Sequence, residues 1–301
     1  TKMNAIDDDV IAMMHEALDE LEANDDWVGM VVANHAENFS VGANIAMVLM
    51  ASQMGNWDML EQMVKRLQDA NMRMKYSKKP CVTCPAGMTL GGGCEVSIHG
   101  TRIQAAAELY MGLVEVGVGV IPAGGGCKEL LCRVLRGVPA DMNVSRMPFI
   151  QKAFEQIALA KVSRSAEEAR GLMYLRPEDG ISIAREKQIG QAKETVLGLA
   201  RSGYRPPLPP DYLILPGRNG IALFEAGLRQ FHDGGFATDH DVVVGRHVAK
   251  VLCGGDIQPN TKVPEQHILD LECEAFLSLC GTEKTQARIE YMLKNGKPLR
   301  N

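Results

Sequence analysis

The sequence predicts an α/β protein that ends in an α-helical region. Between residues 27 and 135, short apolar runs are followed by glycine-containing turns and by segments with helical periodicity, which is typical of α/β crossover folds. After residue 210, the segments repeat their apolar residues at helical spacing. We therefore expect two parts, an α/β core at 1–205 and a helical C-terminal region at 206–301.

In the first half of the chain, helices are expected where apolar residues recur every three or four positions, and strands where short apolar runs end at turn residues. Three aspartates, residues 7–9, open the first helix, where the positive end of the helix dipole favours them. Asn56 is the expected N-cap of a later helix. The expected helices are 7–21, 57–75 and one that opens at 94–98, and the expected strands are 27–33, 80–85, 102–107 and 108–111. The segment 41–52 begins with a glycine turn that runs into a helix, and the glycines 124–126 lead into a helix through residue 135.

In the second half, an expected inserted loop at 137–148 precedes a series of helices. Ser165 and Glu168 have the spacing of a capping box, which predicts a helix start. The proline-rich segment 205–210 predicts a stiff, extended connector. The expected helices are 149–161, 165–174, 183–201, 219–232, 239–253, 264–280 and 282–294.

Composition limits the class of protein. With 301 residues, the chain can form one large domain or two modest ones. The net charge is −5 and the pI about 5.8, and no basic stripe with interleaved aromatic residues occurs, so we expect no nucleic-acid partner. No apolar run approaches the roughly 18 residues of a membrane span, and no signal peptide is visible, so a cytoplasmic location is the expectation.

The eight cysteines do not have the pattern of a disulfide framework, because they lie inside apolar periodic segments of a long chain. Cys81 and Cys84 form a CxxC pair on an expected strand, where positions three apart point to opposite faces. No second CxxC or paired histidines accompany them. We therefore expect no metal site. The dinucleotide fingerprint GxGxxG and the P-loop also fail, because Pro122 replaces the third glycine and no GK[ST] follows.

The segment Ala86–Glu95 organises the sequence. An expected buried strand at 80–85 precedes this segment. The segment contains three consecutive glycines at 91–93, and a helix is expected to open at residues 94–98. Glycines at such a turn allow positive φ and let a ligand approach the backbone. Free N–H groups at a helix start suit an anion, or an oxygen that becomes an anion during a reaction. A glycine run alone could equally be a plain tight turn.

Two further segments fit the same function. Phe39–Ile45 reads F-S-x-G-A-N-I, the glycine turn reads L-G-G-G-C-E, and Glu115 stands seven residues before the proline of an I-P-x-x-G-G run. Together these segments resemble the crotonase (enoyl-CoA hydratase/isomerase) superfamily. The resemblance implies a spiral of ββα units whose C-terminal helices cover an acyl pocket. From Met3 onward, the chain is most similar to the hydratase module of bacterial bifunctional 3-hydroxyacyl-CoA dehydrogenase/enoyl-CoA hydratase enzymes.

The resemblance implies a role for individual residues in hydration of an enoyl thioester. Glu95 and Glu115 would be the catalytic acid–base pair, and the N–H groups of Ala43 and Gly92 the oxyanion hole. Two close carboxylates should have their pKa values pushed apart. Asn44 stands where many relatives have Asp, a position that is usually structural. The residues implied in substrate binding are Ser40, Gly42, Ala43, Gly91, Gly92 and Pro122.

The resemblance also implies cofactors and partners. We expect no metal or redox cofactor in this module, because CoA arrives as part of the substrate. The chain starts at Thr1 without an initiator Met, and this start resembles the point just after the first crotonase strands. We therefore expect an upstream dehydrogenase domain that uses NAD, and a homo-oligomer. The 206–263 segment is longer than in single-function relatives and has no assigned role.

Two alternatives stay open. A Δ3-Δ2 enoyl-CoA isomerase moves one proton, so a glutamate at position 115 alone would be enough, and the presence of Glu95 favours the hydratase. A non-catalytic scaffold module for a dehydrogenase would suit the long C-terminal region. The two intact glutamates argue against it.

Overall fold

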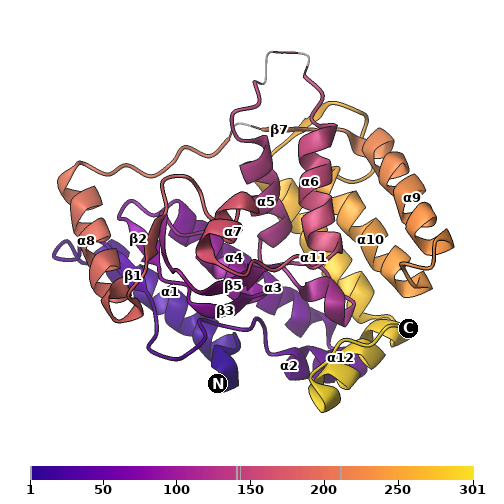
Figure 1. Ribbon diagram of the computed structural model, residues 1–301, viewed down its shortest axis with the longest axis horizontal. Coiled ribbons are helices and arrows are strands. Elements are labelled where there is room, and N and C mark those ends of the chain that lie inside the picture. The colour runs from indigo at the N-terminus through magenta and orange to yellow at the C-terminus, as the bar shows by residue number, and fades with distance from the viewer. Residues whose placement is uncertain (1, 140–141, 143, 211) are drawn as a thin grey trace. The chain divides into compact units, whose positions relative to one another are not determined.

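The computed structural model describes residues 2–139, 142, 144–210 and 212–301, and in them the chain forms two compact units (Figure 1). Unit 1 comprises Thr1–Asn44, Lys65–Leu113 and Val162–Pro209, and unit 2 comprises Ile45–Val64, Val114–Lys161 and Pro210–Asn301. The two units therefore interleave along the sequence. The expected division between residues 205 and 206 stays a prediction.

Unit 1 is built on two parallel sheets. The larger has the strand order β1-β2-β4-β6 and the smaller pairs β3 with β5. Val31 lies opposite Val82, and Thr89 lies opposite Met111. The helix α4 follows β2 and β3 in the chain and leads to β4, so two successive strands and a helix form a ββα unit. The strands are β1 (Met30–Val32), β2 (Cys81–Thr83), β3 (Gly87–Leu90), β4 (Arg102–Ala106), β5 (Leu109–Gly112) and β6 (Gly180–Ser182), and α4 is Gly92–Ile98.

The core of unit 1 lies where apolar strands meet amphipathic helices. All three residues of β2 are buried, and α8 packs Ala192 and Val196 against Val82. The helix α1 follows the expected N-terminal signal, because the Asp7 side chain accepts a hydrogen bond from the Val10 N–H. The other elements of this unit are η1 (Lys2–Asn4), α1 (Asp8–Ala23), α7 (Ala166–Gly171), η3 (Arg185–Lys187) and α8 (Gln188–Arg201), and α3 (Trp57–Lys75) runs from unit 2 into unit 1.

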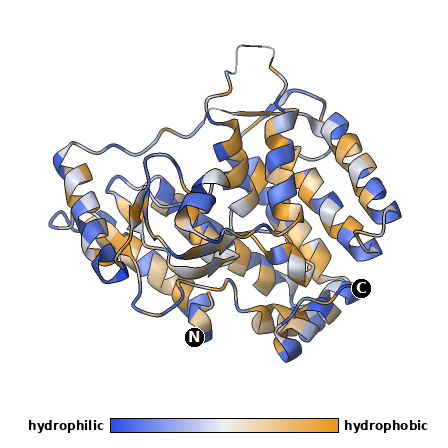
Figure 2. Ribbon diagram, in the orientation of Figure 1, coloured by the Kyte–Doolittle hydropathy of each residue, from blue (hydrophilic) through white to orange (hydrophobic). Residues whose placement is uncertain are grey.

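Unit 2 is mainly helical. Its helix α10 packs against α9, α6 and α11, and Figure 2 shows the alternating hydrophobic and hydrophilic faces of α9 and α10. Glu272 of α11 is buried and accepts hydrogen bonds from the Gly125 and Lys128 N–H groups, which stabilises the start of α5. The elements are α2 (Ile45–Gln53), η2 (Glu115–Val118), α5 (Gly126–Leu135), α6 (Met147–Ala158), β7 (Leu213–Leu215), α9 (Gly217–Asp233), α10 (Asp239–Leu252), β8 (Thr261–Val263), α11 (Glu265–Cys280) and α12 (Glu283–Asn295).

The expected α/β fold with C-terminal helices is confirmed, with local differences. Strands β3 and β6 were not expected, since one is a short glycine-containing segment and the other is only three residues long. The helix expected from Ile183 starts at Gln188, and the Ile183 side chain is exposed. The C-terminal region is not entirely helical, because β7 and β8 pair in antiparallel fashion.

The bounds of other elements also differ from those expected. The strand expected at 27–33 is reduced to β1, and Trp27 is exposed. Ser165 accepts from the Glu168 N–H as a capping box requires, but the Glu168 carboxylate reaches the Arg164 N–H instead of the N-cap. Helix α7 then ends before Met173, which has a positive φ of 63°. Of the inserted loop expected at 137–148, residues 140, 141 and 143 lie outside the described part.

Candidate active site

The glycine turn before α4 lies directly against the segment 40–44. This segment begins with Ser40, which forms a β-bridge to Thr89, and it leads into α2. A Cβ on Gly93 would lie 2.6 Å from the Ser40 carbonyl oxygen, and one on Gly42 would lie 3.2 Å from the Leu90 carbonyl oxygen. Gly42 also has a φ of 103°, in the left-handed region that disfavours side chains. The glycines predicted from the motifs are therefore required for this close backbone approach.

The structure brings the two predicted oxyanion donors onto adjacent segments. Ile6 forms a bridge to Ala43, in which the Ile6 N–H donates to Gly42 and its carbonyl accepts from Asn44. In this geometry the Ala43 N–H points away from Ile6. A Cβ on Gly92 would lie 3.5 Å from the Ala43 nitrogen. Within the described ranges neither the Ala43 nor the Gly92 N–H has a hydrogen-bond acceptor, so both are available to a ligand.

Glu95 is held by a short helix that has no exposed side. All seven residues of α4 are buried, and Glu95 is 3% exposed. The Glu95 N–H donates to the Gly91 carbonyl, and His99 Nδ1 donates to the Glu95 carbonyl oxygen at 2.6 Å. Helix α4 therefore fixes Glu95 one helical turn after the glycine turn that carries the Gly92 donor.

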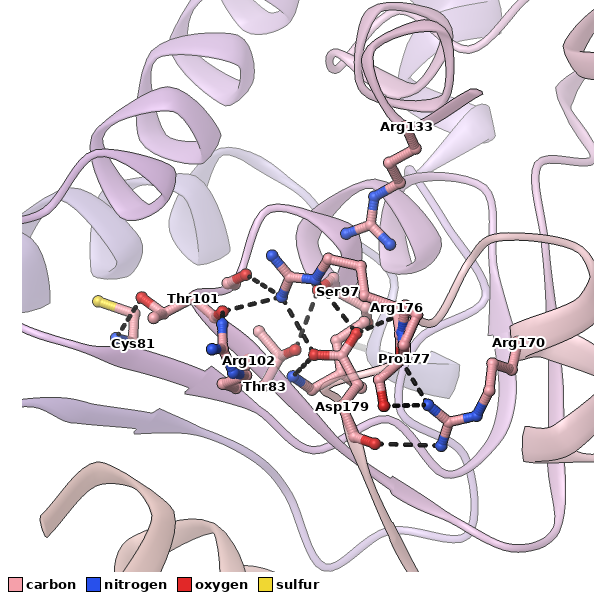
Figure 3. Close-up of polar contacts among 12 residues, drawn as sticks. Cys81, Thr83, Ser97, Thr101, Arg102, Arg133, Arg170, Arg176, Pro177 and Asp179 are labelled. Carbon is pink, nitrogen blue, oxygen red and sulfur yellow. Dashed lines mark hydrogen bonds and ion pairs between the residues drawn. The ribbon is translucent and has the colours of Figure 1, made fainter. Parts of the chain in front are cut away.

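An arginine–aspartate pair holds the far end of α4 (Figure 3). The Arg176 guanidinium donates to the carbonyl oxygens of Gly100 and Thr101, which follow the C-cap residue His99. Asp179 accepts from Arg176 and from the backbone N–H of Ile103 at 2.9 Å, so the same pair also fixes the start of β4. The pair was not predicted, because no sequence motif signals it.

In unit 2, Glu115 opens the 3-10 helix η2 and does not lie in an irregular loop. A chain of hydrogen bonds holds the C-terminal end of this turn. Thr285 Oγ1 donates to the Gly119 carbonyl oxygen at 2.8 Å, and His240 Nε2 lies 2.8 Å from Thr285 Oγ1. Because the Thr285 hydroxyl already donates, His240 carries its proton on Nε2 and donates to Thr285.

Burial, together with the nearby Arg288 charge, lowers the pKa of His240 to about 4. His240 is therefore neutral at pH 7. Arg288 itself is 2% exposed and pairs with Asp241 at 2.8 Å. Burial alone would raise the pKa of Asp241, but hydrogen bonds from Thr238 and Arg288 outweigh it, so the pKa of Asp241 is lowered. Sequence reasoning missed this clamp, which lies partly in the unassigned segment 206–263.

The predicted site residues divide between the two units. Glu95 and five of the residues predicted to bind substrate belong to unit 1, where the contacts described above join them. Glu115 and Pro122 belong to unit 2. Pro122 is buried, and its carbonyl oxygen accepts from the Cys127 thiol. The five in unit 1 are Ser40, Gly42, Ala43, Gly91 and Gly92.

Thiol chemistry is disfavoured at the CxxC pair. Cys81 and Cys84 are free and buried, and burial raises the pKa of each thiol to about 12. Both are therefore protonated at neutral pH and are poor nucleophiles. No helix that the structure describes has the length and apolar character needed to cross a membrane.

The glycine turns, the parallel ββα arrangement and the C-terminal helices together define a class of protein. Residues 1–137 match the family model described as "Enoyl-CoA hydratase/isomerase", which identifies this part of the chain as crotonase/enoyl-CoA hydratase superfamily sequence. Solved structures share the fold. A carnitinyl-CoA dehydratase from Mycobacterium thermoresistibile gives a TM-score of 0.68 at 14% identity, covering 98% of this chain and 84% of that chain. An enoyl-CoA hydratase from Bacillus halodurans gives a TM-score of 0.63 at 15% identity, covering 96% and 91%.

The curated relatives are longer than this chain. The chain is 44% identical over 301 residues to a "Probable 3-hydroxyacyl-CoA dehydrogenase" of Bacillus subtilis (strain 168), covering 100% of this chain and 37% of that protein. It is 35% identical over 293 residues to a "Putative fatty acid oxidation complex trifunctional enzyme" of Rickettsia prowazekii (strain Madrid E), covering 96% of this chain and 36% of that protein. The chain thus spans a little over a third of these relatives.

Proposed function

We propose that this chain is an enoyl-CoA hydratase module of fatty-acid β-oxidation, which adds water to trans-2-enoyl-CoA to give 3-hydroxyacyl-CoA. The observation that carries the proposal is the pair of open N–H groups, from Ala43 and Gly92, one helical turn before the buried Glu95. Fixed backbone donors suit an oxygen that gains charge only during the reaction, because they need no reorganisation.

The reaction assigns a task to each group. The water oxygen forms a bond to C3 of the enoyl group, the C2–C3 π electrons move toward C2 and the thioester oxygen, and that oxygen becomes negative. The Ala43 and Gly92 N–H groups stabilise this charge, and each such donor typically contributes roughly 2.7–4 kcal/mol. Glu95 and Glu115 accept the proton that water loses and supply the proton that C2 gains. The water adds in full, so no redox or metal cofactor is required.

We propose further that the complete protein also carries a 3-hydroxyacyl-CoA dehydrogenase. The printed name of the Bacillus subtilis relative supports this, since the chain accounts for only 37% of that relative. The dehydrogenase would oxidise the 3-hydroxyacyl product and would use NAD. The hydratase module would then supply the substrate of its own neighbouring domain.

The test is hydration of crotonyl-CoA and 2-dodecenoyl-CoA, followed by the loss of enoyl-thioester absorbance, for the wild type, Glu95→Gln and Glu115→Gln. We expect wild-type hydration and a loss of at least 100-fold in each variant, with circular dichroism unchanged. If Glu95→Gln keeps most of its activity while Glu115→Gln does not, an isomerase that uses one glutamate replaces the proposal, and 3-enoyl-CoA conversion would show it. If the folded wild type binds acyl-CoA without hydrating it, the hydratase proposal is wrong for this module.

A further inference from the structure

Within unit 2, one peptide group ends the 3-10 turn that Glu115 opens, and it joins Gly119 to Val120. Its N–H belongs to Val120 and donates to the Glu115 carbonyl oxygen at 3.3 Å. Its carbonyl group belongs to Gly119 and accepts from Thr285 Oγ1 at 2.8 Å. Because a peptide group is planar and rigid, both hydrogen bonds act on one plane. Thr285 of α12 therefore holds the same peptide group that holds the backbone of Glu115.

Gly119 allows α12 to approach this peptide group closely. It has a φ of 86°, in the left-handed region that favours glycine. A Cβ on Gly119 would lie 2.9 Å from Thr285 Oγ1, 3.1 Å from the Thr285 Cα and 3.2 Å from the Arg288 Cδ. Both the turn and the contact with α12 therefore require glycine at this position. The hydrogen bond from Thr285 is thus part of how α12 packs against the turn.

The Thr285 hydroxyl makes two hydrogen bonds that together fix its direction. The Thr285 residue is 0% exposed, its single hydroxyl proton goes to Gly119, and its oxygen accepts from His240 Nε2 at 2.8 Å. His240 is also buried, on α10. A rotation of the hydroxyl would leave the Gly119 carbonyl oxygen and the His240 N–H unpaired in the interior, which is costly. The direction of the Gly119 carbonyl group is therefore fixed as well.

We infer that Thr285 is a positioning residue for the proposed hydration, because it fixes the peptide group that orients the turn of Glu115. The inference rests on the proposed function, which it deepens by assigning a task to a residue outside the motif segments. A carboxylate that transfers a proton must lie within hydrogen-bond reach of that proton. A misplacement of about 1 Å can lower a rate by about 10²-fold. Since Thr285 acts through the backbone, its loss should lower kcat and leave KM unchanged.

Two substitutions at position 285 separate the hydroxyl from the shape of the side chain. Thr285→Val keeps the shape and removes the hydroxyl, whereas Thr285→Ser keeps the hydroxyl and removes the methyl group. Thr282→Val is the matched control, because the Thr282 hydroxyl caps the same helix and accepts from the Thr285 N–H at 3.3 Å. The control should weaken α12 without removing the hydroxyl that holds Gly119. If Thr285→Val does not fold, Thr285→Cys takes its place, because a thiol is a weak donor of similar size.

The experiment has one readout that depends on the reaction and one that does not. Hydration of crotonyl-CoA gives kcat and KM. Amide hydrogen exchange, followed by NMR, gives the exchange rate of the Val120 N–H relative to that of Leu130 in α5, which reports the unfolding of unit 2 as a whole. We expect Thr285→Val to lower kcat roughly 10- to 100-fold, to keep KM within about twofold and to raise the exchange ratio about tenfold. Thr285→Ser and Thr282→Val should stay within about threefold of the wild type in both readouts.

The inference is overturned by a Thr285→Val variant with wild-type kcat, by a rise in KM in place of the fall in kcat, or by an unchanged exchange ratio. A loss of rate that Thr285→Ser or Thr282→Val shares would also overturn it, since the bond would then serve packing alone. Failure of the proposed function has a different signature. A wild type that does not hydrate crotonyl-CoA, while Thr285→Val still raises the exchange ratio, refutes the hydratase and leaves the hold of Thr285 on the turn.

Discussion

Replacing Gly93 by alanine tests whether the close contact between α4 and the Ser40 segment is required for activity. By helix propensity alone, this substitution inside α4 should stabilise the protein by roughly 0.5–1 kcal/mol. The tertiary contact predicts the opposite. The added Cβ would lie 2.6 Å from the Ser40 carbonyl oxygen and 2.8 Å from its Cβ. Both are backbone-anchored atoms, so the two segments must separate.

The magnitude follows from the two effects. Overpacking typically costs about 1–3 kcal/mol, which exceeds the gain in propensity, so the net loss of stability should be roughly 0–2.5 kcal/mol. The effect on catalysis should be larger. Ala43 and Gly92 lie on the two segments that move apart, and losing one oxyanion donor lowers kcat by about 10²–10³-fold. We therefore expect a variant that folds but hydrates crotonyl-CoA at least 100-fold more slowly.

The assay combines urea unfolding with initial rates of hydration. Gly198→Ala is the matched control, because its Cβ meets no atom within 4 Å and it should gain up to about 1 kcal/mol without a change in rate. A folded Gly93→Ala variant with the wild-type kcat would show that the spacing between these segments does not set the oxyanion geometry. Equal stabilisation of both variants would show that the predicted clash is absent.

Three further predictions concern buried polar groups. Glu272→Gln should lower the free energy of unfolding by about 1–3 kcal/mol, because an amide nitrogen would then face one of the two N–H groups at the start of α5; urea denaturation measures this, and an unchanged midpoint would contradict it. Asp179→Asn should cost about 3 kcal/mol, since it removes the buried charge that pairs with Arg176, and it should lower the melting temperature. His240 has a lowered pKa in the folded protein, about 4 against an ordinary 6.5, so the unfolded chain takes up the proton first as pH falls. The contribution of the neutral His240 to the free energy of unfolding is therefore complete above pH 6.5, and at most about 3 kcal/mol is lost between pH 6.5 and about 4. His240→Gln should remove this part of the pH dependence of stability. The same loss of stability in the variant would refute the prediction.

The fold was predictable where local sequence and tertiary structure agree. The helix at 57–75 has both an N-cap and an apolar face, and the structure reproduces its bounds, with the Met59 N–H bonded to the Asn56 side chain. Strand β6 was not predictable from its own residues, because three residues carry too little periodicity. It exists because Gln104, Ala105 and Ala106 of β4 pair with it.

In the candidate site, too, only the residues whose type the local structure requires were predictable from the sequence. Motif spacing identified the glycine turns, because close backbone approach tolerates almost no other residue there. It did not identify Ile6, whose backbone brackets Ala43, or Thr285, which lies far along the chain from Gly119. Backbone hydrogen bonds place no demand on side-chain type, and a single threonine in a helix has many possible reasons. Contacts of this kind leave no pattern in one sequence.

Helix α10 explains why the segment 206–263 can matter to the reaction without touching it. One face of this helix supplies His240, which acts through Thr285 on the carbonyl end of the turn that Glu115 opens. Val244 and Gly245, just over one turn later, line an apolar cavity within unit 2. The same helix therefore holds the turn of a proposed acid–base residue and forms a wall of this cavity. A substitution at His240 should consequently alter the rate of hydration through the turn that Glu115 opens, although α10 supplies neither proposed glutamate.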